Sequence, residues 1–266
     1  MYDFTYHRPG SVADAVAALG SAEDGQLLAG GHTLLPTLKQ RLARPSDVID
    51  LGGIAELSGI SSDGGDIVIG ATTTHAAVAG SDAVKAAIPA LAALADGIGD
   101  AQVRNRGTIG GSIANNDPAA DYPAGLVGLG ATVQTNTRSI AADDFFTGMF
   151  ETALQAGEIV TAVRFPAPEA AGYAKFPNPA SRYAVVGIMV SRGSGGVRVA
   201  VTGAGPCVFR VAEMESALSG SFSADAIEGV AVSAGDLNGD IHASAEYRAH
   251  LVGVMARRAV AAANGT

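Results

Sequence analysis

Cysteine is almost absent from this sequence, which has Cys207 as its one thiol. An iron–sulfur cluster takes about four cysteine ligands and a disulfide takes two, so this chain builds neither by itself. The five histidines show no spacing typical of metal ligands, such as a helical His-Glu-x-x-His. We therefore expect no metal site, and any iron–sulfur cluster must lie on another chain.

Positive charge is also scarce, with 17 basic against 26 acidic residues and a net charge of −9. This balance opposes binding to nucleic acid or to an anionic membrane surface, and no basic run reverses it locally. Apolar stretches such as residues 86–95 are shorter than the roughly twenty residues that span a bilayer. No charged-then-apolar signal region opens the chain. We expect a cytoplasmic protein without a membrane span.

The residues that are present indicate a globular protein. Hydrophobic residues make up 48% and charged residues 16% of 266 residues, enough to bury a sizeable core. This length allows one large domain or two to three small ones. The 35 glycines are the most informative part of the composition, because two Gly-Gly pairs stand in patterned surroundings.

One pair lies in Thr108-Ile-Gly-Gly-Ser112, which continues to Asp121. Paired glycines leave backbone N–H groups unshielded and place no Cβ where a bulky ligand approaches, so such a loop grips a diphosphate. Asp121 is an acceptor suited to ribityl or ribose hydroxyls. The other pair, in Leu28-Ala-Gly-Gly-His-Thr33, follows a short apolar segment and precedes an amphipathic run. Each pair alone is more often a turn than a phosphate site. Two pairs together predict a clasp, a site in which the two motifs hold one ligand between them.

The two motifs, AGGHT and TIGGS, are separated by about eighty residues, and Pro-Ala-Ala-Asp121 follows the second. Together they resemble the FAD-binding signature of the medium subunit of molybdenum hydroxylases, a family that includes aerobic carbon monoxide dehydrogenase and xanthine dehydrogenase. The resemblance runs from Phe4–Pro9 to the closing segments 245–248 and 255–258, and it is strongest to the carbon monoxide dehydrogenase type.

This resemblance implies an α+β fold: a two-part FAD-binding domain of the vanillyl-alcohol-oxidase/PCMH type and a C-terminal cap of antiparallel sheet and helices. We expect an N-terminal α/β subdomain at residues 1–57, a central subdomain at 58–166 and the cap at 167–266. FAD is expected between the first two parts, with its isoalloxazine ring facing the third.

Local patterns give the expected elements. Ser11 caps a helix that ends near Gly20, and Leu34 to Leu42 repeat at helical spacing. Residues 166–172 read as a linker because of their prolines and small residues. The remaining expected strands are 26–29, 48–51, 66–71, 132–135, 158–165 and 197–201, and the remaining helices are 75–98 with breaks at Gly80 and Pro89, 123–129, 211–218 and 246–262.

The resemblance assigns cofactor-binding residues to both motifs and to the segments around them. The predicted set is Leu28, Ala29, Gly30, Gly31, His32, Thr33, Leu34, Ala71, Thr74, Thr108, Ile109, Gly110, Gly111, Ser112, Ala114, Asp121, Val160, Lys175 and Tyr183. No catalytic residue is expected, because a bound flavin carries the chemistry. His32 is interpreted as a capping or backbone-bonded histidine.

Five of these residues have more specific expected roles. Ala71 and Thr74 support the flavin from below, and Val160 lies near its adenine or ring edge. Lys175 matches the family lysine that stabilises negative charge on the reduced flavin, although a lysine that solvates a strand end fits the pattern too. Tyr183 stacks on the flavin or is an ordinary core tyrosine. Ser112 stands where several relatives carry asparagine, so a side-chain contact there is in doubt.

Two functions remain open at this point. The first is an electron-transfer subunit that binds FAD, docks a [2Fe-2S] small subunit and a molybdenum-pterin large subunit in a dimer of heterotrimers, and oxidises no substrate itself. The second is a self-sufficient FAD-dependent oxidoreductase with a nicotinamide donor. A Rossmann or nucleotide-triphosphatase site is disfavoured, because no Gly-x-Gly-x-x-Gly follows a strand and no lysine follows the glycines as in a Walker motif.

Overall fold

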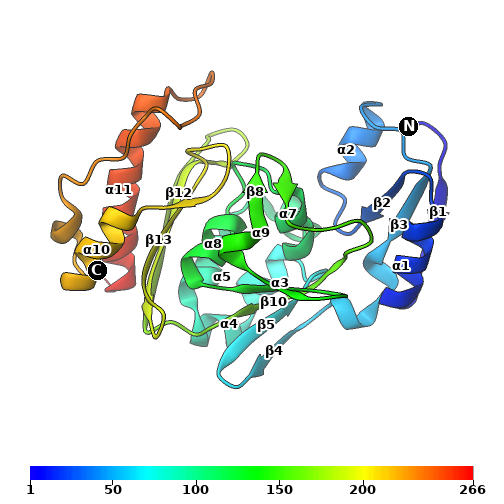
Figure 1. Ribbon diagram of the computed structural model, residues 1–266, viewed down its shortest axis with the longest axis horizontal. Helices are drawn as coiled ribbons and strands as arrows, with labels where there is room; N and C mark the ends of the chain where they lie inside the picture. The colour runs from blue at the N-terminus through cyan, green and yellow to red at the C-terminus, as the bar shows by residue number, and fades with distance from the viewer. Residues whose placement is uncertain (266) are drawn as a thin grey trace.

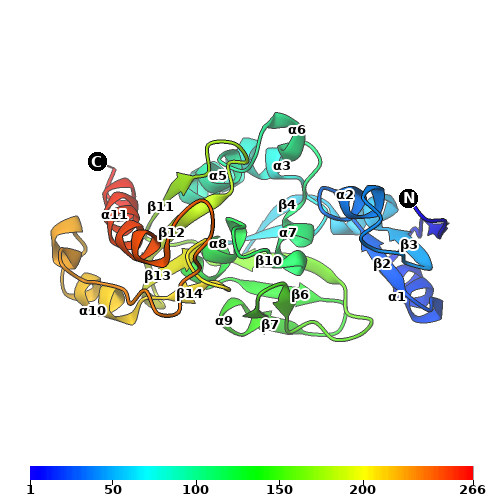
Figure 2. The same cartoon turned by 90° about the horizontal axis from the view of Figure 1, so that it is seen from above.

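The computed structural model describes residues 1–265 and has three β-sheets in a row, each with its own helices (Figures 1 and 2). The N-terminal part lies at one end, the C-terminal part at the other, and the second sheet lies between them. This arrangement confirms the expected mixture of helices and antiparallel and parallel sheet. None of the helices in the described residues has the length and hydropathy of a membrane span.

The N-terminal sheet is parallel, with strand order β1-β3-β2. Its elements are β1 (Thr5–His7), α1 (Val12–Ser21), β2 (Gly25–Leu28), α2 (Leu34–Lys39), β3 (Asp47–Asp50), and the 3₁₀ turns η1 (Leu51–Gly53) and η2 (Ala55–Leu57). Ser11 caps α1 by accepting a hydrogen bond from the backbone of Asp14, as expected. A small core around Ala15, Ile49 and Ile54 holds this part together.

The central sheet is antiparallel, with strand order β4-β5-β10-β6-β7. Its strands are β4 (Ile60–Asp63), β5 (Asp66–Gly70), β6 (Thr132–Thr135), β7 (Ser139–Ala141) and β10 (Val160–Phe165). Its helices are α3 (His75–Gly80), α4 (Asp82–Ala87), α5 (Pro89–Asp96), α6 (Ala101–Arg104), α7 (Ile109–Asn115), α8 (Tyr122–Leu129) and α9 (Ala142–Phe145). The breaks at Gly80 and before Pro89 lie where the sequence predicts them.

A two-stranded hairpin, β8 (Phe146–Gly148) and β9 (Glu151–Thr152), closes the end of α7. Asn116 caps α7 in the left-handed conformation with φ of 43°, and asparagine tolerates that region better than most residues. Its side-chain amide donates to the carbonyls of Gly148 at 2.8 Å and Glu151 at 2.7 Å. One buried side chain therefore fixes the hairpin to the helix that begins at the second glycine motif.

The C-terminal sheet is antiparallel, with strand order β11-β12-β13-β14. Its elements are β11 (Ala170–Pro177), β12 (Ala184–Gly193), β13 (Gly196–Thr202), β14 (Phe209–Arg210), α10 (Ala212–Gly220), η3 (Ala224–Ile227) and α11 (Ala245–Ala263). The expected linker over 166–172 is wrong in its second half, because Ala170 to Gly172 pair with β12. Their small side chains serve close packing: a Cβ on Gly172 would lie 2.0 Å from the carbonyl oxygen of Ala259 in α11.

The two faces of the C-terminal sheet pack against two different hydrophobic cores. Val190 and Val199 pack into a core with α10 and α11, whereas Met189 and Ala200 belong to the central core. Figure 1 shows α11 on the outer side of this sheet and α5 and α8 on its inner side. The cap is thus packed directly on the central part.

Candidate functional site

The structure brings the two glycine motifs together. A Cβ on Gly30 would lie 2.1 Å from the carbonyl oxygen of Arg106 and 2.9 Å from the Cα of Gly107, so only glycine permits this contact. The missing Cβ of Gly111 faces Ala29, at 3.9 Å from its Cβ. Segments that are distant in sequence therefore form the two sides of one narrow site, as the predicted clasp requires.

The first motif offers free backbone donors. Gly31 has φ of 77°, a left-handed conformation that turns the chain from β2 into α2. Within the described residues, the N–H groups of residues 30–34 donate to no acceptor, whereas the next one, of Leu35, bonds to the carbonyl of Gly31 at 3.0 Å. A run of unbonded amides at the start of a helix is a concavity suited to an anion such as a diphosphate.

The second motif is not a loop with free amides, and that prediction was wrong. Thr108 is the N-cap of α7, and its hydroxyl accepts from Gly111 N at 3.2 Å. The N–H of Ile109 bonds to Thr73 O at 3.1 Å, and that of Gly110 bonds to Ala71 O at 2.8 Å. These donors are satisfied within the chain, so the motif fixes the position of α7 rather than presenting its own amides.

The paired glycines of this motif have different roles. A Cβ on Gly110 would lie 2.6 Å from the Cβ of Ala71, so this glycine lets α7 approach the end of β5. Gly111 and Ala114 are exposed, and the Ser112 hydroxyl has no hydrogen-bond partner among the described residues. Only the face formed by Gly111, Ser112 and Ala114 is open toward a ligand.

Three further predicted residues lie beside this helix. Ala71 is 4% exposed beneath Gly110, and Val160 is 6% exposed in the central core. Thr74 caps α3 by accepting from Ala77 N at 3.3 Å, and it forms a bridge with Thr108. All three therefore support α7. Their contact with a flavin stays a prediction.

His32 and Tyr183 are both exposed. The ring of His32 makes no hydrogen bond within the described residues, so the interpretation as a capping or backbone-bonded histidine is wrong. Tyr183 is 47% exposed, which excludes an ordinary core tyrosine. Partial burial raises the pKa of its hydroxyl, and the negative charges of Asp117 and Asp121 raise it further.

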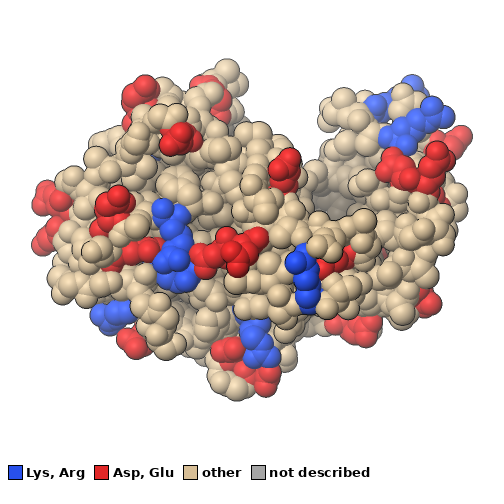
Figure 3. Space-filling view, in the orientation of Figure 1, with Lys and Arg blue, Asp and Glu red and all other residues tan. Residues whose placement is uncertain are grey.

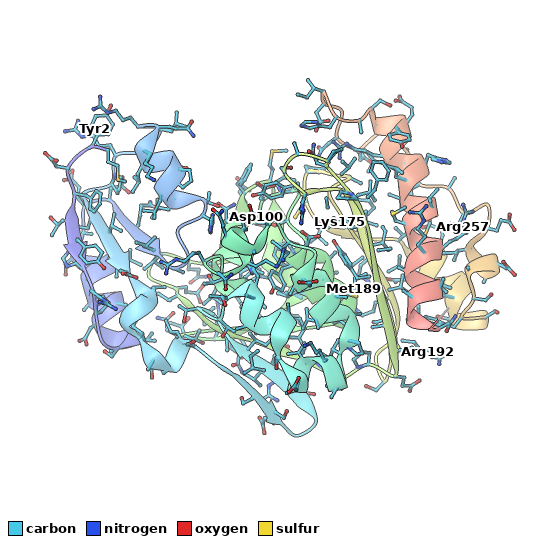
Figure 4. The ribbon with its side chains drawn as sticks, turned by 180° about the vertical axis from the view of Figure 1, so that it is seen from behind. Tyr2, Asp100, Lys175, Met189, Arg192 and Arg257 are labelled. Carbon is cyan, nitrogen blue, oxygen red and sulfur yellow. The ribbon has the colours of Figure 1, made fainter. Side chains whose placement is uncertain are left out.

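Asp121 and Lys175 form a buried ion pair. Nζ of Lys175 lies 2.9 Å from Oδ1 of Asp121, and the two side chains are 9% and 4% exposed. The hydroxyl of Tyr173 donates to the same oxygen. Lys175 also donates to the carbonyls of Gly97 at 2.8 Å and Arg182 at 3.0 Å. The lysine therefore does not solvate a strand end; it joins α5, α8 and the cap, and Figure 4 shows it between these parts.

This pairing alters the electrostatics expected for both residues. Burial raises the pKa of the Asp121 carboxyl, and the positive charge of Lys175 and the hydrogen bond from Tyr173 oppose that rise. The lysine charge is thus largely compensated by its partner. The side-chain contacts of Asp121 with Tyr173 and Lys175 are both made through Oδ1, so Oδ2 is the oxygen left for a ligand hydroxyl.

His75 and Tyr122 each directly follow a predicted site residue in the chain and are absent from the predicted set. Their rings lie 5.3 Å apart, and Nδ1 of His75 and the hydroxyl of Tyr122 are buried without a partner in the described chain. Burial lowers the pKa of His75 to about 4, helped by the charges of His32 and Arg104. A histidine directly after three threonines, and a tyrosine directly after Asp121, are the only sequence signals for this pair.

The cap holds the segment that follows the second motif. The N–H of Gly203 donates to Pro118 O at 2.8 Å, and the N–H of Ala184 donates to Ala119 O at 3.2 Å. The hydroxyl of Thr202 donates to Ala120 O at 2.6 Å. Residues 118–121 are therefore positioned by β12 and β13, which explains how a C-terminal domain shapes an N-terminal site.

A separate groove of about 630 Å³ lies over α3, α5 and α6. Its charged lining residues are Lys85, Asp96 and Arg104, and the rest are mostly alanines. None of the predicted cofactor-binding residues lines it. This groove is thus distinct from the space between the glycine motifs. No group of His, Cys, Asp and Glu residues in the described chain has the geometry of a metal site.

Comparison with known proteins covers nearly the whole chain. The family described as FAD binding domain in molybdopterin dehydrogenase matches residues 2–168, and the family described as CO dehydrogenase flavoprotein C-terminal domain matches residues 173–263. This chain belongs to the FAD-binding medium subunits of the molybdenum hydroxylase family. It is an FAD subunit of a dehydrogenase complex, and the resemblance drawn from the two motifs is confirmed.

Individual relatives agree with the family. The carbon monoxide dehydrogenase medium chain of Afipia carboxidovorans is 40% identical, over 97% of this chain and 95% of that protein. The nicotine 6-hydroxylase medium subunit of Paenarthrobacter nicotinovorans is 38% identical, over 96% of this chain and 95% of that protein. The solved structure of reconstituted CO dehydrogenase from Oligotropha carboxidovorans has a TM-score of 0.90 at 36% identity and covers 99% of this chain and 98% of its own.

The residues of this chain fit the cofactor of the family. Unbonded amides at residues 30–34 match a diphosphate, and the opening at Gly111 leaves room beside them. Oδ2 of Asp121 matches a hydroxyl donor. The amides and the carboxylate are two separate anchors, which suits an elongated ligand.

Proposed function

We propose that this chain is the FAD-binding electron-transfer subunit of a heterotrimeric molybdenum hydroxylase of the carbon monoxide dehydrogenase type. In this role it takes electrons from a [2Fe-2S] subunit and passes them to an external acceptor. The observation that carries the proposal is the run of unbonded amides at residues 30–34, held against the helix that begins at Thr108.

The residues of the site have separate tasks in this proposal. When bound, FAD accepts electrons singly or in pairs, and the protein supplies position and electrostatics. The amides of residues 30–34 hold the diphosphate, and the Gly111 face of α7 lets it approach closely. Asp121 accepts from a hydroxyl through Oδ2, while Lys175 holds its other oxygen. Of the remaining predicted residues, the exposed His32 and Tyr183 line the cofactor, whereas the buried Ala71, Ile109 and Val160 support the wall formed by α7.

Substrate oxidation is assigned to another chain. Cys207 is the one cysteine of this sequence, so the iron–sulfur clusters belong to a small subunit. The molybdenum-pterin cofactor belongs to a large subunit, and the complex is a dimer of heterotrimers in the cytoplasm. Relatives of similar identity include subunits named for carbon monoxide and for nicotine, which supports a division in which the large subunit sets the substrate.

The proposal is tested with the purified chain and its partner subunits. We expect the chain to bind one equivalent of FAD with a flavin absorption spectrum, and to be reduced only when the reduced iron–sulfur subunit is added. Direct reduction by a nicotinamide donor, with turnover by the chain alone, would favour the self-sufficient oxidoreductase. Absence of flavin binding would exclude both.

A further inference from the structure

Helix α2 ends in a hydrogen-bond pattern that normally requires glycine. The N–H of Arg41 bonds to Leu38 O at 3.1 Å, and the N–H of Leu42 bonds to Thr37 O at 3.0 Å. This pair of bonds defines a Schellman motif, in which the residue at the position of Arg41 adopts the left-handed conformation and is usually glycine. Arg41 has φ of 60°, so an arginine occupies a strained position.

The next residue departs from the same motif. The residue after the left-handed position is commonly apolar and packs back on the helix. Leu42 is apolar, and the sequence places it on the helical apolar face, but it is 74% exposed and lies outside α2. Arg41 therefore lacks the glycine character, and Leu42 the packing, that would stabilise the end of the helix.

Aromatic and basic side chains surround this helix end. The guanidinium groups of Arg41 and Arg44 lie 5.6 Å and 5.3 Å from the ring centroid of Tyr2, which is 41% exposed. Met1 is 49% exposed beside it. Figure 3 shows a group of basic residues at the top of this end of the molecule, with acidic residues directly below them, and Figure 4 shows Tyr2 at this end, far from Arg257 and Arg192.

We propose that this surface, formed by Met1, Tyr2, Arg41, Leu42 and Arg44, docks an acidic patch with an apolar pocket on another subunit of the complex. Tyrosine, methionine and arginine are enriched at protein interfaces, and tyrosine and arginine dominate their binding energy. The two arginines pair with the carboxylates and Leu42 fills the pocket. This inference rests on the proposed function, because it assigns a partner surface to the same subunit.

A different chain is the partner that the charges favour. In a symmetric contact between two copies, each patch meets its equivalent, so Arg41 and Arg44 would face like charges. A non-symmetric contact between copies would build a ring or an open chain, and not the dimer of heterotrimers of the proposed function. Nucleic acid and anionic membranes share the needed negative charge, but the net charge of −9 on the chain as a whole repels both.

The affinity of the FAD-loaded chain for the purified complex of its partner subunits tests the proposal. We expect the double variant Arg41→Glu/Arg44→Glu, and separately Leu42→Asp, to weaken binding by about tenfold or more. The loss for the arginine variant shrinks at high salt, because screening weakens charge pairs. The matched control is Arg257→Glu/Arg258→Glu on α11, which changes affinity less than twofold. FAD content stays unchanged in every variant.

The variant Arg41→Gly separates docking from folding. Glycine relieves the left-handed strain, so the variant unfolds at the same or a higher temperature than the unchanged chain. Its affinity for the partner nevertheless falls severalfold. A merely structural role of Arg41 would give higher stability with unchanged affinity.

Other outcomes overturn the proposal in distinguishable ways. Unchanged affinity in the arginine and leucine variants would overturn this surface alone. This surface alone would also be overturned if the variants left the affinity for the partner subunits unchanged and instead abolished either binding to anionic vesicles or self-association of the chain. If the unchanged chain held FAD but bound no partner subunit, the proposed function would fail together with this surface.

Discussion

The two glycine motifs share a sequence signature and differ in structure. In the first motif, the N–H groups of residues 30–34 are unbonded and the helix that follows is short. In the second, the N–H groups of Ile109, Gly110 and Gly111 are all bonded within the chain, and the glycines lie in the first turn of α7. Paired glycines therefore mark close approach of backbone in both, but only the first marks free donors.

This difference in backbone hydrogen bonding gives the two motifs complementary roles. The first supplies the hydrogen bonds for an anion, and the second supplies a fixed wall against which the first is held. Gly30 connects them, because its missing Cβ allows contact with Arg106 O. We therefore expect changes in the first motif to affect cofactor binding most, and changes in the second to affect stability first.

The largest effect on cofactor binding is expected for Gly30→Ala. The added Cβ would lie 2.1 Å from a backbone oxygen that cannot rotate away, so the two motifs must separate. FAD retention should fall by more than about a hundredfold, roughly 3 kcal/mol in binding free energy. Equilibrium dialysis with FAD measures this. The control is Gly10→Ala, where nothing lies within 4 Å of the new Cβ; equal loss in both would contradict the clasp.

The next prediction concerns the contribution of the buried Asp121–Lys175 ion pair to stability. Lys175→Met leaves the Asp121 carboxylate buried without its partner, which costs about 3–5 kcal/mol of unfolding free energy. The variant should also lower the reduction potential of bound FAD, because a negative charge is no longer compensated. The double variant Lys175→Met/Asp121→Asn should recover most of both quantities. Denaturant unfolding and potentiometric titration measure them, and additive losses in the double variant would exclude coupling.

Acid should weaken the fold through His75. Its folded pKa is about 4 against 6.5 unfolded, so the unfolded chain binds the extra proton as the pH falls. The stabilisation is complete above pH 6.5 and is lost between pH 6.5 and about 4, by roughly 3 kcal/mol in total. Urea unfolding at several pH values checks this. His75→Gln should remove this part of the pH dependence, and an unchanged profile would assign it to other groups.

Much of the fold was predictable from the sequence. Local signals, such as Ser11 as a cap and the breaks at Gly80 and Pro89, act through neighbouring residues and gave the helices near their observed bounds. Leu42 was placed on the apolar face of α2 because periodicity does not detect a left-handed residue that ends a helix. Ala170 to Gly172 looked like a linker because small residues that serve close packing resemble flexible ones.

The sequence predicted that the two motifs belong together, but it did not predict the hydrogen bonds between the segments. The residues of both motifs lie together, but which amides are bonded depends on Ala71 and Thr73, which are distant in sequence from the glycines. The sequence assigns Asp121 and Lys175 each to a cofactor, whereas the fold pairs them with one another across 54 residues. Partners of this kind come from tertiary packing, so no local pattern reveals them. The division at residues 57 and 166 stays a prediction.

The smallest expected effects distinguish the role of Gly110 in stability from the role of Gly111 in FAD binding. In Gly110→Ala the new Cβ would lie 2.6 Å from Ala71, so overpacking should cost about 1–3 kcal/mol of unfolding free energy. In Gly111→Ala the Cβ would lie 2.9 Å from the Thr108 hydroxyl, a side-chain atom, and 3.9 Å from the Cβ of Ala29, so stability should change by less than about 1 kcal/mol. FAD affinity should instead fall about tenfold, because the methyl group occupies the space that the diphosphate approaches. If both variants lost stability equally and Gly111→Ala still bound FAD normally, the Gly111 face of α7 would not be part of the cofactor site, and the first motif would bind the diphosphate alone.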